Sequence, residues 1–185
     1  SKKDLTEWLF SKYNLKKNFN ILEVGCGLGK HVIKESNIIG TKGYILAIDN
    51  SKESISELNK NKLKNVETIC MEMDLLPSLL QKKNIYYDRI LSSYAIYYAN
   101  DPLILIRKLI PFLKPNGELI ITMPNTPHTL IQMITSKEKI PLNVTQSLYF
   151  GKNILKPYLK NNYKNIKFIN FKNELKFKEI NDFYN

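Results

Sequence analysis

The sequence has few of the residues that cross-link small proteins or bind phosphate tightly. It contains two cysteines, Cys26 and Cys70, and neither belongs to a CxxC pair or a spacing typical of zinc sites. A disulfide framework is not expected in a chain of 185 residues, so we expect two reduced, mostly buried thiols and no metal site. Arg89 and Arg107 are the only arginines. No apolar run is long enough to span a bilayer, which predicts no membrane segment.

The net charge of +11 is carried almost entirely by lysine. Arginine is the usual residue for bidentate contacts to phosphates and bases, so a solvated basic surface is favoured over a nucleic-acid groove. The composition, 43% hydrophobic and 24% charged, predicts one globular domain over residues 1–185. The opening residues lack the apolar segment of a secretory signal, and a cytoplasmic location is the expectation. The sequence carries no signal that predicts an oligomeric state.

Short apolar runs alternate with helical segments, which is typical of an α/β fold with a doubly wound, mostly parallel sheet. The predicted strands cover 20–24, 44–48, 66–71, 88–94, 118–123 and 166–171. Helices are predicted at 4–13, 51–62, 101–113 and 152–161. Another follows the glycine-rich turn after the first strand and runs through about Ser36, and a short one follows Asp74. LKPNG is predicted to be a turn, and residues 126–149 carry no readable pattern.

The last residues leave two alternatives open. Lys172-Asn173 turns a hairpin and ELKFK forms a final strand, or the chain is truncated within an insertion. We favour truncation, because the closing FKNELKFKEINDFYN resembles the interior of a helix and has no cap.

Three glycines follow the first strand in ILEVGCGLGKHV, at positions 25, 27 and 29. Glycine permits the positive φ of a sharp strand-to-helix turn and lets a ligand approach bare backbone. The helix N-terminus then offers free N–H groups to an anion, which for S-adenosylmethionine is the methionine carboxylate. A dinucleotide site prefers G-x-G-x-x-G, whose third glycine would fall at Lys30, so a dehydrogenase is a remote alternative.

Acidic residues follow the next two strands. Asp49 can accept hydrogen bonds from two ribose hydroxyls, and Asp74 can accept from an adenine amino group. The plainer interpretation of each is a helix cap, although Ser51 fills that role better than Asp49. An open α/β sheet binds ligands at the carboxyl ends of its strands, so the combined positions favour a cofactor site.

These segments resemble the class I S-adenosylmethionine-dependent methyltransferases, over roughly residues 15–125. The resemblance is carried by ILEVGCGLG, AIDNS, MEMD, YDRILSSYAIYYAND and LKPNGELIITMPN. It is greatest for the small-molecule branch, which includes ubiquinone-biosynthesis and trans-aconitate methyltransferases. The resemblance implies a Rossmann-like sheet of order 3-2-1-4-5-(7)-6 with the last strand missing if the chain is truncated. It also implies S-adenosylmethionine as the cofactor and a small-molecule acceptor.

The resemblance also implies a set of cofactor-binding residues. The glycines would line the methionine end, with Glu23 and Cys26 in the same segment. Asp49 would bind ribose, with Asn50 beside the adenine. Asp74 and Leu75 would flank the adenine ring, and Ser92 and Tyr94 would lie near the methyl group. The implied set is Glu23, Gly25, Cys26, Gly27, Gly29, Asp49, Asn50, Asp74, Leu75 and Ser92.

No catalytic base is assignable from the sequence. Tyr94, after the fourth strand, and His128, after the fifth, are the candidates, against core-aromatic and loop-histidine interpretations. His31 is expected to be a helix-surface or satisfied histidine. The first helix either lids the site or simply packs. An RNA or protein methyltransferase using the basic surface, and a non-catalytic cofactor-binding partner protein, remain alternatives.

Overall fold

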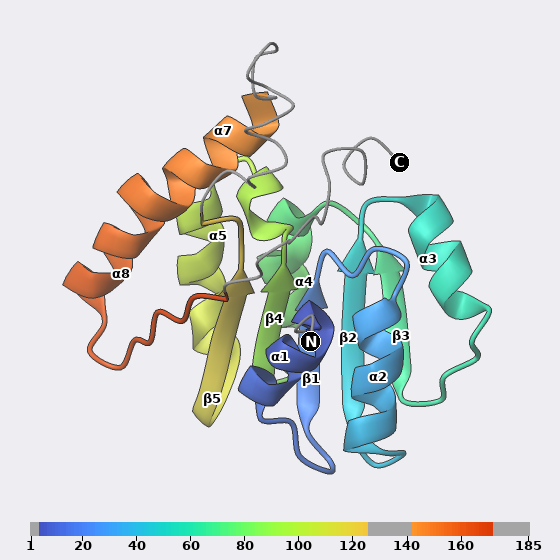
Figure 1. The fold of residues 1–185 in the computed structure, drawn as a ribbon. Helices are drawn as coiled ribbons and strands as arrows, with labels where there is room; N and C mark the ends of the chain where they lie inside the picture. Colours follow the sequence, from blue (N-terminus) through green and yellow to red (C-terminus); the bar gives the residue numbers. More distant parts are fainter. Residues whose placement is uncertain (1–3, 126–141, 172–185) are drawn as a thin grey trace, which may run out of the picture.

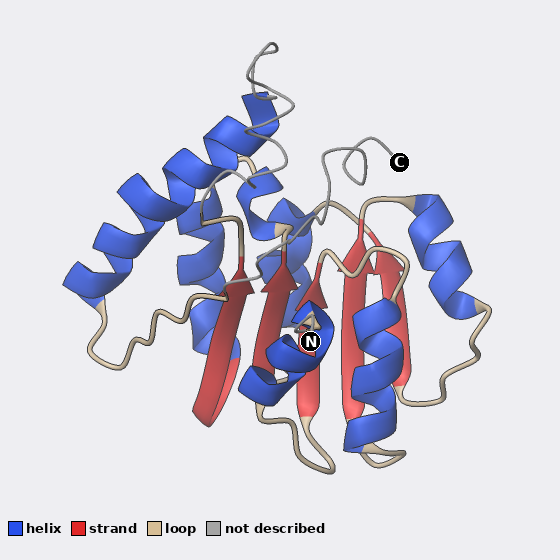
Figure 2. Cartoon of the chain, viewed as in Figure 1, coloured by secondary structure: helices blue, strands red, loops and turns tan. Residues whose placement is uncertain are grey.

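The computed structural model describes residues 4–125 and 142–171. Its centre is a parallel sheet of five strands in the order β3-β2-β1-β4-β5, with helices on both faces (Figure 1, Figure 2). The predicted α/β fold class is therefore confirmed. The strands are β1 (Asn20–Val24), β2 (Tyr44–Asp49), β3 (Val66–Cys70), β4 (Tyr87–Ser93) and β5 (Leu113–Thr122). The helices are α1 (Leu5–Tyr13), α2 (Lys30–Ile39), α3 (Lys52–Asn59), α4 (Leu76–Lys83), α5 (Pro102–Leu109), α7 (Leu142–Tyr149) and α8 (Lys156–Asn162). The short segments are η1 (Met73–Leu75), η2 (Ile96–Tyr98), η3 (Ile110–Phe112) and the π-helical η4 (Phe150–Leu155).

The period of two along each strand divides the core into two layers. In β1, Ile21 packs with α1, α2 and α3, whereas Leu22 and Val24 pack with α4 and α5. Strands covered on both faces are the condition under which a parallel sheet is stable. Each fully buried Leu or Ile contributes about 2 kcal/mol before conformational entropy is counted. The alternation also directs Glu23 to the α1 and α2 side, where it is 2% exposed.

Two predicted helix starts are confirmed in detail. The Ser51 hydroxyl accepts from the Ser54 N–H at 3.1 Å and caps α3. Asp101 caps α5, accepting from Ile104 N–H at 2.9 Å, and Pro102 occupies the first turn, where it displaces no intrahelical bond.

The predicted turn LKPNG is wrong, because these residues begin β5. Tyr87 of β4 pairs with Leu113, and Arg89 pairs with Glu118, so β5 carries extra residues at a register shift. Pro115, which has no N–H, lies within this irregularity, where the regular ladder is interrupted. A local pattern of turn residues cannot distinguish such a bulge from a loop.

The predicted sixth strand, residues 166–171, is also wrong. The segment is not in the sheet, and Phe168 and Ile169 are 43% and 53% exposed. Apolar and β-branched residues form a strand only where a neighbour pairs with them. The neighbour that the sequence offered, ELKFK, lies outside the described residues. The Phe171 ring, at the end of the segment, packs 5.0 Å from that of Trp8 on α1.

The helix predicted at 152–161 is confirmed as η4 and α8, whereas α7 lies in the stretch that carried no readable pattern. Within residues 4–125 and 142–171, no helix combines the length and apolar character needed to cross a membrane.

Candidate functional site

The glycine loop lies where the sheet order reverses, because β1 pairs with β2 on one side and with β4 on the other. This reversal opens a crevice at the carboxyl ends of the strands in folds of this class. The N–H groups of Gly25 and Cys26 both donate to the Ile48 carbonyl, each at 2.9 Å. The end of β2 therefore holds the start of the loop in place.

The glycines of the loop face different surroundings. A Cβ built on Gly25, whose φ is +76°, would lie 2.2 Å from the Ala95 Cβ. A Cβ on Gly27, at φ +51°, would meet no atom of the described residues within 4 Å. Gly29 is crowded by Leu58. Gly25 and Gly29 thus serve internal packing, whereas Gly27 presents bare backbone to open space, where a ligand can approach.

Asp49 links the loop to the end of β2. Its Oδ2 accepts from Gly27 N–H at 2.8 Å and its Oδ1 accepts from Ser51 N–H at 3.0 Å. A carboxylate offers about four acceptor positions, so each oxygen retains a free lone pair. Asp49 therefore orients the loop and can still receive two hydroxyl donors.

The other residues predicted to contact adenine lie at the ends of β2 and β3. Asn50 donates to Glu72 at 3.3 Å, and Asp74 accepts from the Asn100 N–H at 3.2 Å. Leu75 is 60% exposed. The structure brings these residues to the expected edge of the sheet, and Glu72 is an addition that the sequence analysis missed.

A pocket of about 390 Å³ lies between the glycine loop and α1. It is lined by the residues predicted to bind the methionine end of the cofactor and by residues of the first helix. The residues predicted to bind ribose and adenine, Asp49, Asn50, Asp74 and Leu75, are not among its lining residues. Its lining comprises Leu5, Thr6, Leu9, Glu23, Gly25, Cys26, Gly27, Leu28, Gly29, Lys30, His31, Ser93 and Tyr94. Helix α1 packs on the core through Leu9 and Tyr13, which confirms the packing alternative, and Leu5, Thr6 and Leu9 form part of the pocket wall. A lid role for this helix stays a prediction.

Ser92 and its neighbour point in different directions. The buried Ser92 hydroxyl donates to the Val24 carbonyl at 3.1 Å and does not line the pocket. Ser93 lines the pocket and shares a hydrogen bond of 2.9 Å with the Tyr13 hydroxyl. Side chains alternate between the two faces along β4, which accounts for this difference. The sequence alone does not show which of the two adjacent serines faces the pocket.

Tyr94 lies in the pocket wall with an unusual backbone. Its φ is +56°, a left-handed conformation that is uncommon for a bulky residue, and its N–H donates to the Thr122 carbonyl at 2.8 Å. Its side chain is 42% exposed, and partial burial raises the pKa of its hydroxyl. Such strain is concentrated at functional sites. His128, the other catalytic candidate, lies outside the described residues.

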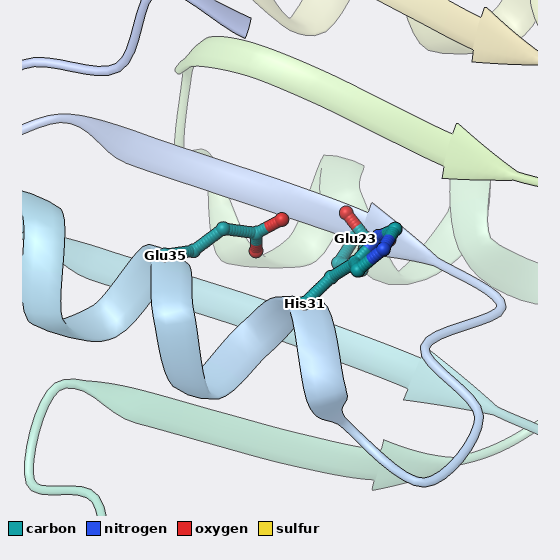
Figure 3. A group of neighbouring side chains, drawn as sticks. All are labelled: Glu23, His31 and Glu35. Atoms are coloured by element: carbon teal, nitrogen blue, oxygen red, sulfur yellow. The ribbon is translucent and has the colours of Figure 1, made fainter. Parts of the chain in front are cut away.

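Glu23, His31 and Glu35 form a cluster between β1 and α2, with ligand atoms all within 4.8 Å of one another (Figure 3). Burial raises the pKa of Glu35 to about 8, and burial together with Glu35 raises that of Glu23 well above its usual range. His31 is half-buried with its ring edge-on to Phe10 at 5.5 Å, and burial lowers its pKa, which favours the neutral imidazole.

The two cysteines are free, as predicted, but only one is sheltered. Burial, followed by the charge of Asp49, raises the pKa of Cys26 to about 12. Cys70 is exposed, which corrects the expectation of two mostly buried thiols. It ends β3, an edge strand of the described sheet whose other residues are only partly buried.

Comparison with known proteins agrees with this geometry. A family profile described as a methyltransferase domain matches residues 15–172. The chain belongs to this methyltransferase family. A probable cobalt-precorrin-6B C(15)-methyltransferase (decarboxylating) from Saccharolobus solfataricus is 27% identical over 92 residues, which are 49% of this chain and 46% of that protein.

Solved structures of methyltransferases share the fold. A SAM-dependent methyltransferase from Aquifex aeolicus is 26% identical with a TM-score of 0.56, covering 67% of this chain and 66% of that one. The plantazolicin methyltransferase BpumL, in complex with a pentazolic desmethylPZN analog and SAH, has a TM-score of 0.62 at 21% identity, covering 85% and 63%. The chain therefore spans less than two thirds of these methyltransferases, and under half of the curated relative.

Proposed function

We propose that this chain is the cofactor-binding domain of an S-adenosylmethionine-dependent methyltransferase that acts on a small-molecule acceptor. The observation that carries the proposal is the open face of Gly27, which a Cβ would fill, held beside Asp49 by a hydrogen bond of 2.8 Å. A bare peptide and an acidic acceptor at neighbouring strand ends suit a ligand that has a carboxylate at one end and a ribose further along.

Each part of the site has a defined task in this proposal. The loop and the first N–H groups of α2 receive the carboxylate, and Asp49 accepts from the ribose hydroxyls. When bound, S-adenosylmethionine would supply an activated methyl group: a nucleophile of the acceptor would bond to the methyl carbon in line as the carbon–sulfur bond breaks, and the thioether of S-adenosylhomocysteine would leave. The protein then contributes position and electrostatics, because the leaving group is already activated. Tyr94 in the pocket wall orients the acceptor.

The size of the pocket supports a small acceptor. Its volume of about 390 Å³ lies toward the lower end of the range for small-molecule sites, and the methionine end of the cofactor would occupy part of it. Leu5 and Leu9 of α1, with Leu28 of the loop, give it an apolar wall. The curated relative is named for cobalt-precorrin-6B, which favours an acceptor of this size class.

Calorimetric titration with S-adenosylhomocysteine tests the cofactor site. Asp49→Asn is expected to weaken binding by about tenfold or more, because charge-assisted hydrogen bonds are worth roughly 1.5–3 kcal/mol. Asp88→Asn is the matched control: this carboxylate also accepts two hydrogen bonds, from Asn20 N–H and Lys114, both at 2.7 Å. It lies at the opposite ends of the strands, so the control should bind like the wild type. Absence of binding to the wild type, or equal losses in both variants, would contradict the proposal.

The acceptor class needs a separate assay. Formation of S-adenosylhomocysteine is measured with a panel of small acceptors, in the presence and absence of RNA. Turnover with a small acceptor that RNA does not inhibit supports the proposal. Strongly salt-dependent RNA retention with turnover only on RNA would support the basic-surface alternative. Cofactor binding without turnover on any acceptor would favour a non-catalytic partner protein.

A further inference from the structure

Glu35 is an acidic residue on the buried face of α2, where an apolar side chain is expected. The buried face of α2 follows the spacing i, i+3, i+4, i+7, and it consists of Val32, Glu35, Ser36 and Ile39. Glu35 is 0% exposed, and neither of its oxygens has a hydrogen-bond partner among the described residues. Burying a charged carboxylate in this way is costly unless a cation pairs with it or a proton neutralises it.

A second carboxylate increases this cost. Glu23 of β1 is 2% exposed and its Oε2 also has no partner in the described parts of the chain. Figure 3 shows the Glu35 side chain extending along α2 toward Glu23 and His31. The nearby ammonium group, that of Lys34, instead bonds Glu7 and lies 4.6 Å from the centre of the Phe10 ring. The cluster therefore contains two buried acids and an imidazole, without a paired cation in the described residues.

We propose that Glu23, His31 and Glu35 bind a divalent transition-metal ion, with zinc as the preferred ion. Carboxylate oxygen and imidazole nitrogen are both zinc ligands, and three protein ligands leave one coordination position open. Calcium and magnesium fit less well, because they prefer shells made largely or entirely of oxygen. The absence of a metal site predicted from the sequence rested on cysteine and histidine spacing, which this set of ligands lacks.

The geometry is compatible with this ion after a small movement. The ligand atoms lie within 4.8 Å of one another, and ligands of one zinc ion at about 2.0–2.2 Å stand roughly 3–3.5 Å apart. Rotation about the glutamate side-chain torsions can supply the remaining ångström or so. Because Glu23 and His31 line the pocket and Glu35 does not, the open coordination position faces the pocket. The ion would fix the first turn of α2 to β1 beneath the glycine loop.

The test uses chelator-treated protein titrated with Zn²⁺ by calorimetry, and with Co²⁺ by visible absorption. One ion per chain is expected, with an intense tetrahedral cobalt spectrum and no thiolate charge-transfer band. Glu35→Gln and His31→Gln are each expected to weaken binding by about tenfold or more, in line with the loss of a metal ligand. Glu57→Gln, the same change on the exposed surface of α3, and His128→Gln, which removes the other histidine, should bind like the wild type.

Three results would overturn the proposal: no stoichiometric zinc binding by the wild type, zinc binding unaltered by Glu35→Gln, or a cobalt–thiolate band. If Glu35→Gln does not fold, His31→Gln decides the same question at a half-buried position. Binding of S-adenosylhomocysteine is measured in parallel on metal-free protein. Failure of the metal proposal then leaves that binding intact, whereas failure of the proposed function abolishes it in every variant.

Discussion

Substituting alanine at Gly25 and Gly27 separates the packing role of the loop from its ligand-binding role. At Gly25 the new Cβ would lie 2.2 Å from the Ala95 Cβ, a distance that forces the backbone to shift. The left-handed φ of +76° costs an L-residue about 1–2 kcal/mol, and overpacking adds about 1–3 kcal/mol. Alanine also restricts the unfolded chain, which returns about 0.4–1 kcal/mol. The expected net loss of unfolding free energy is about 3 kcal/mol.

Gly27→Ala is expected to have a small effect on stability and a large effect on cofactor affinity. The position has φ +51°, and within the part of the chain that the structure describes the new methyl group would meet no atom within 4 Å, so only the backbone cost applies. The free energy of unfolding should fall by about 1 kcal/mol or less once the unfolded-state effect is included. The methyl group does, however, occupy the face that the cofactor would approach. Affinity for S-adenosylhomocysteine should therefore fall by about tenfold or more.

A compensating substitution makes the packing argument quantitative. Ala95→Gly removes the atom that the new methyl group would strike, so it should recover about 2 kcal/mol in the Gly25→Ala background and destabilise the wild type. Urea denaturation of the four proteins gives this coupling energy as a double-mutant cycle. A coupling below about 0.5 kcal/mol, or equal destabilisation by Gly25→Ala and Gly27→Ala, would refute the reasoning.

Three further outcomes are expected. Arg89→Met should lower the unfolding free energy by about 3 kcal/mol in thermal melts, because the buried guanidinium bonds the end of α1; a loss below about 1 kcal/mol would contradict this role. In mildly alkaline buffer a thiol reagent should modify Cys70 quickly and Cys26 only after denaturation, because the Cys26 pKa is raised to about 12. Lys83 and a tyrosine hydroxyl lower the Glu67 pKa, so Glu67→Gln should cost about 0.5 kcal/mol at neutral pH after solvent screening. That difference should disappear in acid, as the pH falls through the lowered pKa of the folded state; a loss that persists there would assign it to packing.

The sheet was predictable where local pattern and burial agree. β1 has the predicted bounds because NILEV is buried on both faces, as an interior parallel strand requires. The caps Ser51 and Asp101 were equally legible, because a cap acts within three residues of its own position. The errors came where pairing partners decide the structure. The bulge that places Pro115 inside β5 depends on pairing with β4, about 25 residues earlier in the chain, and residues 166–171 do not join the described sheet despite their strand-like pattern.

The candidate site was likewise predictable from the sequence only in part. The glycines and Asp49 were identifiable because a strand–turn–helix cofactor loop leaves a short contiguous pattern. The contribution of α1 to the pocket was not, since Leu5 and Leu9 approach the loop only through the fold. A signal for Glu35 was present in the sequence, as an acid in the apolar stripe of α2, but only the structure places it beside Glu23.

Glu23 connects the two proposed sites, and this connection determines which variant can separate them. Period-two alternation places its side chain on the α1 and α2 face of β1, where it lines the pocket and also approaches Glu35. A substitution of Glu23 would therefore disturb cofactor binding and metal binding together. Glu35 contributes to the cluster but does not line the pocket. Substitution of Glu35 is therefore expected to remove the metal ion while the glycine loop and Asp49 stay unchanged.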